Sequence, residues 1–326
     1  MQRIKEYLGN DWSAVQEMIS SALLSDIELL NSTNRAILSN SGKQLRPLLA
    51  LLFARMCAKG EVTEAAVRYA AASELLHNAT LLHDDVADES NQRRGKPTVR
   101  SLMGPSVSVL VGDYWLVKAV ELILRKADSD TEAIRIFSKT LSDLAEGEML
   151  QLQKAQTGDT TEADYSRIIY NKTASLFEAA CLSAAEASCA DEEMKQAAVD
   201  YAVALGMAFQ VRDDILDYCG SESSVGKALG VDIAEQKITL PLLGALSNVS
   251  DERASQVRDM VRDIVSHPEN KEAIMSFVKD NGGVEYAEQS LVRYIDKAVA
   301  ALSVFPDSTE KEYLVELAHF TAKRAK

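Results

Sequence analysis

Six aspartates form two clusters with the same spacing. The first cluster is Asp84, Asp85 and Asp88, and the second is Asp213, Asp214 and Asp217. Helical residues four positions apart lie on one face, so on a helix each cluster would present two carboxylates together. Like charges at this spacing destabilise a helix by about a few tenths of a kcal/mol. Carboxylate oxygens are hard ligands that suit Mg²⁺, and the pattern therefore predicts magnesium chemistry.

The neighbours of each cluster help to decide between a solvated surface and a site. His77 and Thr80 fall within about 40° of Asp84 on a helical wheel, which makes one polar stripe with the first cluster. Taken alone, this stripe is better explained as an exposed acidic helix end. The second cluster has apolar neighbours such as Phe209 and Ile215, and buried carboxylates are costly unless they are neutralised or bind a metal. Two such clusters on separate helices favour a site.

Basic residues in short segments accompany both clusters. They are Lys43 and Arg46 early in the chain, Arg93, Arg94 and Lys96 after the first cluster, Lys172 within a helix, and Lys227 and Lys237 after the second cluster. Arginine offers a planar fork for phosphate oxygens, and lysine offers a point charge. Each of these residues alone is expected to be a solvated charge. Together with the acids they predict a diphosphate held between Mg²⁺ and cationic side chains.

The elements that must position these residues are helices. The 326 residues include only 15 Gly and 6 Pro, few for a protein of many strands, and apolar residues recur at helical spacing. We expect one all-α domain over 1–326, a large helical bundle. The expected helices are roughly 11–39, 44–58, 63–88, 105–126, 130–154, 162–188, 191–219, 235–248, 251–266, 271–279, 283–303 and 308–324.

The charge and the termini limit the class of protein. The formal net charge is −14, which argues against a nucleic-acid-binding role because such proteins need a basic surface. The N-terminus lacks the apolar region of a signal peptide, and no apolar run reaches the roughly 18 residues of a membrane span. We therefore expect a cytoplasmic protein.

With these residues in view, the chain resembles the trans-isoprenyl diphosphate synthases of the polyprenyl synthetase family, from Gly42 to about Pro241. The resemblance implies an all-α homodimer whose helices surround a deep central cavity. It implies that two aspartate motifs face each other there and bind three Mg²⁺ with an allylic diphosphate. The implied reaction is a head-to-tail, trans condensation of isopentenyl diphosphate with that allylic diphosphate.

The resemblance also assigns a role to each matching position. It implies that Asp84, Asp88 and Asp213 ligate Mg²⁺, and that Asp85, Asp214 and Asp217 support them. It assigns isopentenyl diphosphate to Lys43, Arg46, His77 and Arg94, and the allylic diphosphate to Arg93, Lys172, Thr173, Gln210, Lys227 and Lys237, of which Lys172 and Lys227 are also counted as catalytic. One departure is Gln236, which stands where the family pattern has glycine before Lys237.

The size of two residues next to the first cluster bears on the length of the product. Ala79 and Thr80, just before Asp84, are small, and in the family this implies a long product of about C30 to C50, a quinone side chain or carrier-lipid precursor that passes to a membrane. Ala79 is equally consistent with helix packing.

One alternative function is a class I terpene cyclase or head-to-head synthase, and another is a non-catalytic regulatory subunit of a prenyl synthase. Two complete aspartate clusters favour the elongating enzyme.

Overall fold

The computed structural model describes residues 1–40, 42–58, 60–93, 95–125, 131–219 and 229–324. The expected all-α class is confirmed. Among the described residues the only strands are β1 (Gln92–Arg93) and β2 (Lys96–Pro97), an antiparallel pair in which Arg93 lies opposite Lys96. No helix in this part of the chain is both long and apolar enough to cross a membrane.

The structure describes helices along nearly the whole length of the chain. In chain order they are α1 (Gln2–Leu8), α2 (Asn10–Ala22), α3 (Glu28–Ser39), α4 (Leu45–Cys57), α5 (Glu64–Ala87), α6 (Val99–Met103), α7 (Pro105–Leu124), α8 (Thr131–Thr157), α9 (Glu162–Ile169), η2 (Tyr170–Ala174), α10 (Ser175–Ala187), α11 (Glu192–Cys219), α13 (Val231–Ala234), α14 (Leu240–Ser247), α15 (Asp251–Arg262), α16 (Asn270–Asp280), α17 (Gly283–Ala301), η3 (Leu302–Val304) and α18 (Thr309–Lys323).

The chain divides into two compact units. The first comprises Met1–Lys139, Glu178–Val199 and Ser303–Leu314, and the second comprises Thr140–Phe177, Asp200–Leu302 and Val315–Lys326. The first aspartate cluster belongs to the first unit, and the second cluster belongs to the second unit.

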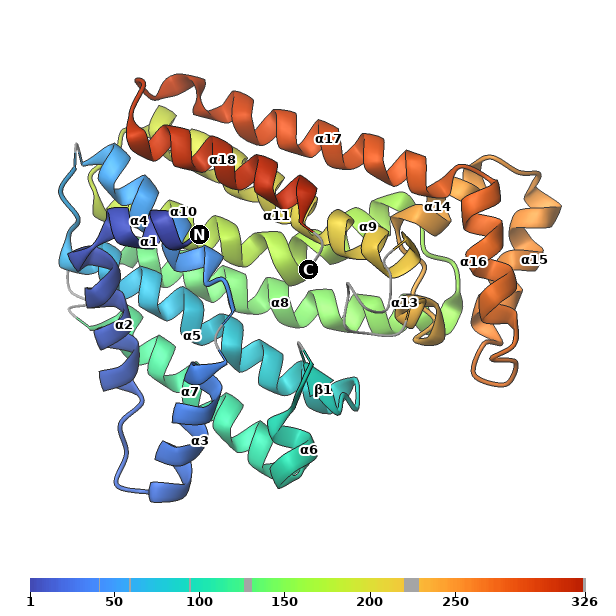
Figure 1. Cartoon of the computed structure of the whole chain (residues 1–326), viewed down its shortest axis with the longest axis horizontal. Helices are drawn as coiled ribbons and strands as arrows, with labels where there is room; N and C mark the ends of the chain where they lie inside the picture. Colours follow the sequence, from blue (N-terminus) through green and yellow to red (C-terminus); the bar gives the residue numbers. More distant parts are fainter. Residues whose placement is uncertain (41, 59, 94, 126–130, 220–228, 325–326) are drawn as a thin grey trace. The chain divides into compact units, whose positions relative to one another are not determined.

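The first unit is built around α5. This helix packs on α2, α4 and α7, and Figure 1 shows α5 and α7 side by side. Small buried residues on α5, such as Ala71 and Ala72, let its neighbours approach closely. Helix α4 is buried on nearly every side, including Phe53, whose ring packs edge-on against Phe305. A helix buried all round belongs to the centre of a core, so α4 and α5 together form the core of this unit.

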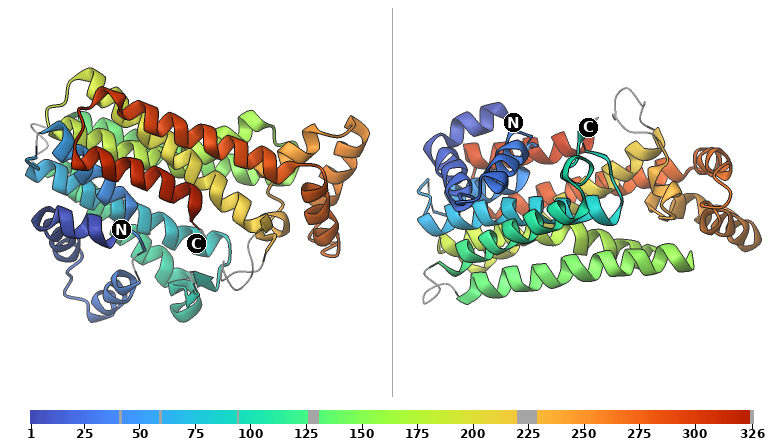
Figure 2. Two further views of the ribbon diagram at one scale, coloured as in Figure 1. Left: turned by 45° about the horizontal axis from the view of Figure 1, so that its top comes forward. Right: turned by 90° about the horizontal axis from the view of Figure 1, so that it is seen from below.

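The second unit contains α9, η2, the Asp200–Cys219 part of α11 and the helices from α13 to α17, together with parts of α8, α10 and α18. Helix α14 packs on α16 and α17, and α15 packs on α16 (Figure 1; the orange and brown helices of Figure 2). The residues Leu240–Leu246 of α14 are buried throughout, which makes this short helix the core of the cluster. Helix α9 contacts α14 and leads directly into η2.

Three expected helices differ from the observed ones by an interruption or by a later start. The expected helix 11–39 is interrupted between α2 and α3, where Asn34 donates to the carbonyl of Leu23 and stabilises the turn. The expected helix 162–188 contains the π-helical turn η2. The expected helix 235–248 begins only at Leu240, because Thr239 is extended and Pro241 occupies the first turn. Proline is favoured at that position of a helix, since its missing N–H is not needed there.

Candidate active site

The first cluster lies at the C-terminal end of α5. Asp84 is half-buried, Asp85 is buried and Asp88 is exposed. The helix ends at Ala87, and the backbone N–H of Asp88 still donates to the carbonyl of Asp84, at 2.8 Å. Asp88 therefore keeps nearly helical placement, one turn beyond Asp84. His77 and Thr80 are also half-buried, so the polar stripe expected from the wheel lies on the less buried face of α5.

Asp85 is neutralised by a neighbouring cation. Its Oδ1 lies 2.8 Å from Nε of Arg93 on β1, and its side chain is only 6% exposed. A buried carboxylate needs such a partner, because removal from water is costly. Arg93, expected to hold the allylic diphosphate, thus lies directly beside the first cluster. Arg94 lies outside the described residues.

The residues expected to hold isopentenyl diphosphate share the first unit. Lys43 and His77 are half-buried, and Arg46, in the first turn of α4, is 8% exposed. Gln44, between the two cations, has a left-handed backbone with φ of 54°. A non-glycine residue in this region costs about 1–3 kcal/mol, and such residues cluster at functional sites.

The second cluster lies near the end of α11. Asp213 is exposed, Asp214 is 3% exposed and Asp217 is half-buried. Asp213 pairs with Arg324, with Nη2 2.7 Å from Oδ1. The Arg324 guanidinium also stacks on the ring of Phe209 and donates to its carbonyl. One potential metal ligand is thus already held by a cation.

Asp214 is the centre of a buried hydrogen-bond chain. It accepts from the hydroxyl of Tyr165 at 2.6 Å and from Nε2 of Gln210 at 2.9 Å. Oε1 of Gln210 in turn accepts from the hydroxyl of Thr173 at 3.0 Å. Burial raises the pKa of Asp214 to about 7, against the opposing effect of these two donors. The chain links the second cluster to Gln210 and Thr173, both expected to hold the allylic diphosphate.

Asp217 binds the N-terminal end of α13. Its two carboxylate oxygens accept from the backbone N–H groups of Val231 and Asp232, at 3.1 and 3.0 Å. These N–H groups begin α13, so Asp217 anchors that short helix. Burial and the carboxylates of Asp214 and Asp217 raise the pKa of Asp232.

Of the two lysines expected after the second cluster, the structure describes Lys237 and not Lys227. Lys237 pairs with Glu235. Lys227 lies outside the described residues. Gln236, the departure from the family pattern, has φ of 59° and bonds through its N–H to the carbonyl of Ile233. It thus adopts the left-handed conformation that glycine takes most easily.

Lys172 and Thr173 lie in the π-helical turn η2. Lys172 Nζ is 2.6 Å from a carboxylate oxygen of Glu148 on α8. A Cβ at Gly147 would lie 2.7 Å from Cβ of Asn171, and one at Gly206 would lie 2.6 Å from Cα of Ala174. Two glycines therefore let α8 and α11 approach η2 closely. Single π-helical turns are frequent at functional sites.

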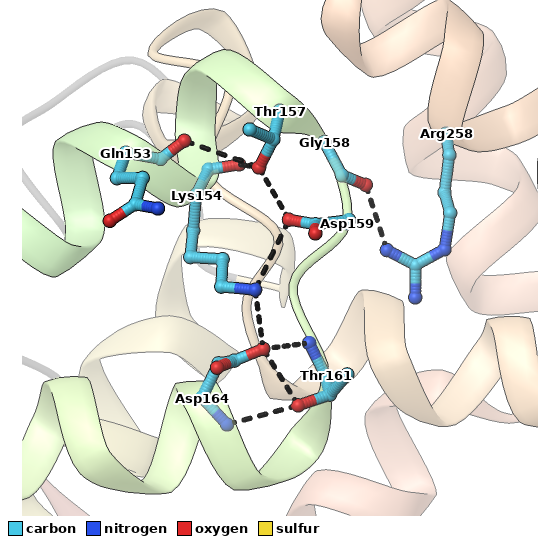
Figure 3. A network of polar contacts seen from close by, with 8 residues as sticks. All are labelled: Gln153, Lys154, Thr157, Gly158, Asp159, Thr161, Asp164 and Arg258. Carbon is cyan, nitrogen blue, oxygen red and sulfur yellow. Dashed lines mark hydrogen bonds and ion pairs between the residues drawn. The ribbon is translucent and has the colours of Figure 1, made fainter.

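A polar network holds the start of α9, the helix that carries Tyr165 (Figure 3). Lys154 lies 2.9 Å from Asp164 and 3.2 Å from Asp159. Asp164 and Thr161 form a capping box, in which each side chain bonds the backbone N–H of the other. Hydrogen bonds from Thr161 and the Lys154 ammonium lower the pKa of Asp164 to about 2.

The donor set fits Mg²⁺. In the described part of the chain no three His, Cys, Asp or Glu residues gather as a ready-made metal site. Mg²⁺ keeps several waters and is usually held by one or two carboxylates together with substrate phosphates. Asp84 and Asp88, one helical turn apart, offer two carboxylates of this kind, and Asp213 offers one. These residues suit an ion that arrives with a diphosphate.

Four residues near the clusters were not expected from the sequence. They are Tyr165 and Arg324, which bind Asp214 and Asp213, and Glu148 and Glu235, which pair with Lys172 and Lys237. No spacing rule connects them to the aspartate clusters.

Comparison with known proteins identifies the family. The family model described as Polyprenyl synthetase matches residues 27–278. The chain belongs to the polyprenyl synthetase family. As a polyprenyl synthetase, it is a trans-prenyltransferase, which confirms the class of enzyme expected from the aspartate clusters.

Individual relatives cover nearly all of this polyprenyl synthetase. The octaprenyl diphosphate synthase of Escherichia coli is 39% identical over 99% of both chains. The all-trans-nonaprenyl-diphosphate synthase (geranyl-diphosphate specific) of Rhodobacter capsulatus is 35% identical over 99% of this chain and 98% of its own. The polyprenyl synthase of Caulobacter crescentus, solved with calcium and isoprenyl diphosphate, is 34% identical, with a TM-score of 0.89 and coverage of 100% of this chain and 98% of that chain.

Proposed function

We propose that this polyprenyl synthetase is a Mg²⁺-dependent enzyme that adds isopentenyl diphosphate units to an allylic diphosphate and makes a long-chain product. The observation that carries the proposal is the second cluster. Its three aspartates are all present, and Asp214 is bonded through Gln210 to Thr173, two residues expected at the allylic diphosphate. A cluster that had lost its role would not be expected to keep this buried chain intact.

The metal ligands in the proposal are Asp84, Asp88 and Asp213, with three Mg²⁺ per active site. When bound, Mg²⁺ supplies Lewis-acid stabilisation to the negative charge that develops on the leaving diphosphate. Asp85 and Asp217 hold the backbone and the cations around the ligands, as their bonds to Arg93 and to α13 support.

The side chains expected to bind the substrates act by position and charge. In the proposal Lys43, Arg46 and His77 hold isopentenyl diphosphate, and Arg93, Lys172 and Thr173 hold the allylic diphosphate. The cations are prearranged donors aimed at oxygens whose charge increases as the allylic C–O bond breaks. Lys172 is kept in place by Glu148, and Thr173 by Gln210.

The reaction balances without a side-chain base. The allylic C–O bond ionises to diphosphate and a delocalised cation, and C4 of isopentenyl diphosphate attacks C1 of that cation. A proton then leaves C2, and the departing diphosphate accepts it. Apolar residues near the site exclude water, which would otherwise quench the cation.

The long product rests on α5 and on the relatives. Ala79 is 1% exposed and Thr80 half-buried, both small residues one turn before Asp84. Small residues there leave room for a growing chain, and a product of about C30 to C50 is proposed. The octaprenyl and nonaprenyl synthases among the relatives support this range.

Two competing functions make different products. A terpene cyclase or head-to-head synthase would not consume isopentenyl diphosphate, and a regulatory subunit would do nothing alone. The test is incubation of the pure protein with isopentenyl and farnesyl diphosphates, with and without Mg²⁺, followed by sizing of the product. A Mg²⁺-dependent series of long products is expected. Cyclic products, or no turnover with saturating Mg²⁺, would overturn the proposal.

A homodimer is also part of the proposal. On α7, Leu110, Val117 and Leu124 lie seven residues apart and are 68%, 52% and 46% exposed. A row of exposed apolar residues along one helix is unusual on a monomer, and a second copy of the chain would cover it. The double variant L110E/V117E should elute as a monomer in light-scattering chromatography. Val292→Glu, at an exposed apolar position of α17, should leave the dimer intact.

We further propose that residues 1–326 form one catalytic domain. The family match at 27–278 includes residues of both compact units, which supports this organisation. Thermal unfolding followed by calorimetry should then give one transition, and two well-separated transitions would contradict it.

A further inference from the structure

Helix α7 contacts the backbone of α5 just before the first aspartate cluster. Ser108 is fully buried, and its hydroxyl donates to the carbonyl of Leu82 at 2.8 Å. Leu82 lies two residues before Asp84. A buried side-chain bond from one helix to the backbone of another determines how far the two helices can slide along each other.

One turn further along α7, Gly112 lies against the ring of His83. A Cβ at Gly112 would lie 2.5 Å from Nε2 and 2.7 Å from Cδ2 of that ring, closer than real Cβ contacts allow. The space of a side chain on α7 is thus filled by the imidazole from α5. His83 directly precedes Asp84, so this contact limits how α5 can rotate at the cluster.

The next residue, Asp113, holds the same ring through a hydrogen bond. Its Oδ1 lies 3.1 Å from Nε2 of His83. A carboxylate only accepts, so the imidazole donates from Nε2. The side chain of Asp113 is 58% exposed and that of His83 is 35% exposed, and a polar contact so exposed contributes little to stability. Its effect is to orient the ring.

We propose that Ser108 and Asp113 are positioning residues for prenyl transfer. They hold the Leu82–His83 turn of α5, and this turn places the carboxylates of Asp84 and Asp88 where they can ligate the metal. Gly112 provides the space that this arrangement requires. The inference rests on the proposed function, because it concerns the same carboxylates. Ligands of a catalytic metal need to be held within about 0.5 Å, and partners of this indirect kind typically contribute about 10–100-fold in metal affinity or activity.

The test compares Asp113→Ala with Asp113→Asn. The asparagine oxygen can still accept from His83, whereas alanine cannot. We expect Asp113→Ala to raise the Mg²⁺ concentration for half-maximal activity about 10-fold, with the KM for isopentenyl diphosphate unchanged. Asp113→Asn should stay close to wild type. Binding of Mn²⁺ in the presence of inorganic diphosphate, followed by electron paramagnetic resonance, should weaken in parallel and needs no turnover.

The control is Glu121→Gln, an exposed acid of α7 that pairs within its own helix with Lys118. If wild type and this control make no polyprenyl product, the proposed function fails. If both are active and Asp113→Ala has the Mg²⁺ dependence and Mn²⁺ affinity of wild type, the positioning role fails. Equal losses in the alanine and asparagine variants would also overturn it. If Asp113→Ala does not fold, Ser108→Ala is measured in its place. An unchanged Mg²⁺ concentration for half-maximal activity in Ser108→Ala would then overturn the positioning role.

Discussion

Arg324 and Asp213 form an ion pair at the end of the second aspartate cluster, with Nη2 2.7 Å from Oδ1. The arginine is 7% exposed, and its guanidinium carbon lies 3.7 Å from the centre of the Phe209 ring. Asp213 is the residue of this cluster expected to ligate Mg²⁺. A side chain near the C-terminal end of the described chain therefore places a positive charge beside this carboxylate.

Replacing Arg324 should lower the free energy of unfolding measured without Mg²⁺. Arg324→Met removes the ion pair, the stacking on Phe209 and the bond to the Phe209 carbonyl. Because Asp213 is 45% exposed and can be solvated, the expected loss is modest, about 1–2 kcal/mol of unfolding free energy. Urea denaturation without Mg²⁺ measures it. Lys323→Met, at the exposed neighbouring position, should have no such effect, and equal stability of the two variants would show that the pair contributes nothing.

Loss of a candidate metal ligand should abolish most of the turnover. Asp84→Ala and Asp213→Ala each remove a carboxylate from the proposed Mg²⁺ sites, and kcat with saturating Mg²⁺ should fall by about 100-fold or more. The measurement is product formation from isopentenyl and farnesyl diphosphates. Asp26→Ala, in the segment between α2 and α3, serves as the control and should be fully active. A kcat close to that of wild type in either variant would contradict the assignment of that aspartate as a Mg²⁺ ligand.

A bulky residue at position 79 should shorten the product. Ala79→Tyr would place an aromatic ring where a growing chain is proposed to pass, and chromatography should show shorter products with turnover retained. Overpacking of a buried site also costs about 1–3 kcal/mol, so the unfolding temperature has to be measured alongside. Thr80→Phe, at the half-buried neighbouring position, provides a second variant with less strain. An unchanged product length in both folded variants would mean that neither residue lines the path of the chain.

The stability contributed by Asp164 should depend on pH. The folded-state pKa of Asp164 is about 2, below its ordinary value of 3.8, so the ionised form is favoured by folding. Its contribution is fully present above about pH 4 and is lost as the pH falls through 2. Asp164→Ala should therefore cost about 1–2 kcal/mol at pH 7, less than the full shift implies because solvent screens the pair, and nearly nothing at pH 2. The capping variant Thr161→Ala removes no titrating group. Its cost, from urea titrations at both pH values, should therefore change less, and a pH-independent cost for Asp164→Ala would contradict the prediction.

Replacing Gly147 by alanine should weaken the binding of the allylic diphosphate. A Cβ there would lie 2.9 Å from Cγ of Lys172 and 3.1 Å from its backbone nitrogen, so Gly147→Ala must displace η2. We expect a cost of about 1–3 kcal/mol in stability and a raised KM for the allylic substrate, with the KM for isopentenyl diphosphate unchanged. Initial-rate kinetics with each substrate varied separately measure this. Ala145→Ser, on the exposed face of α8, is the matched control. Equal changes in both KM values would speak against a local effect at Lys172.

The sequence by itself determined the helical class, the two aspartate clusters and the family. These rest on local patterns, since the i, i+4 spacing of Asp84 and Asp88 is set by the helix that contains them. The position of the polar stripe of α5 on the less buried face also followed from periodicity, because His77 lies on that stripe. Glycine in the family pattern even marked the left-handed turn that Gln236 adopts.

Only the tertiary structure decided which partner each carboxylate has. Tyr165 and Asp214 are 49 residues apart and meet because α9 packs against the end of α11, which also makes Asp214 the most buried acid of its cluster. Arg324 reaches Asp213 by the same kind of long-range packing, and Gly147 permits η2 where periodicity predicted an uninterrupted helix. Periodicity describes one helix at a time. The desolvation that forces a buried carboxylate to find a donor depends on what the other helices bring to it.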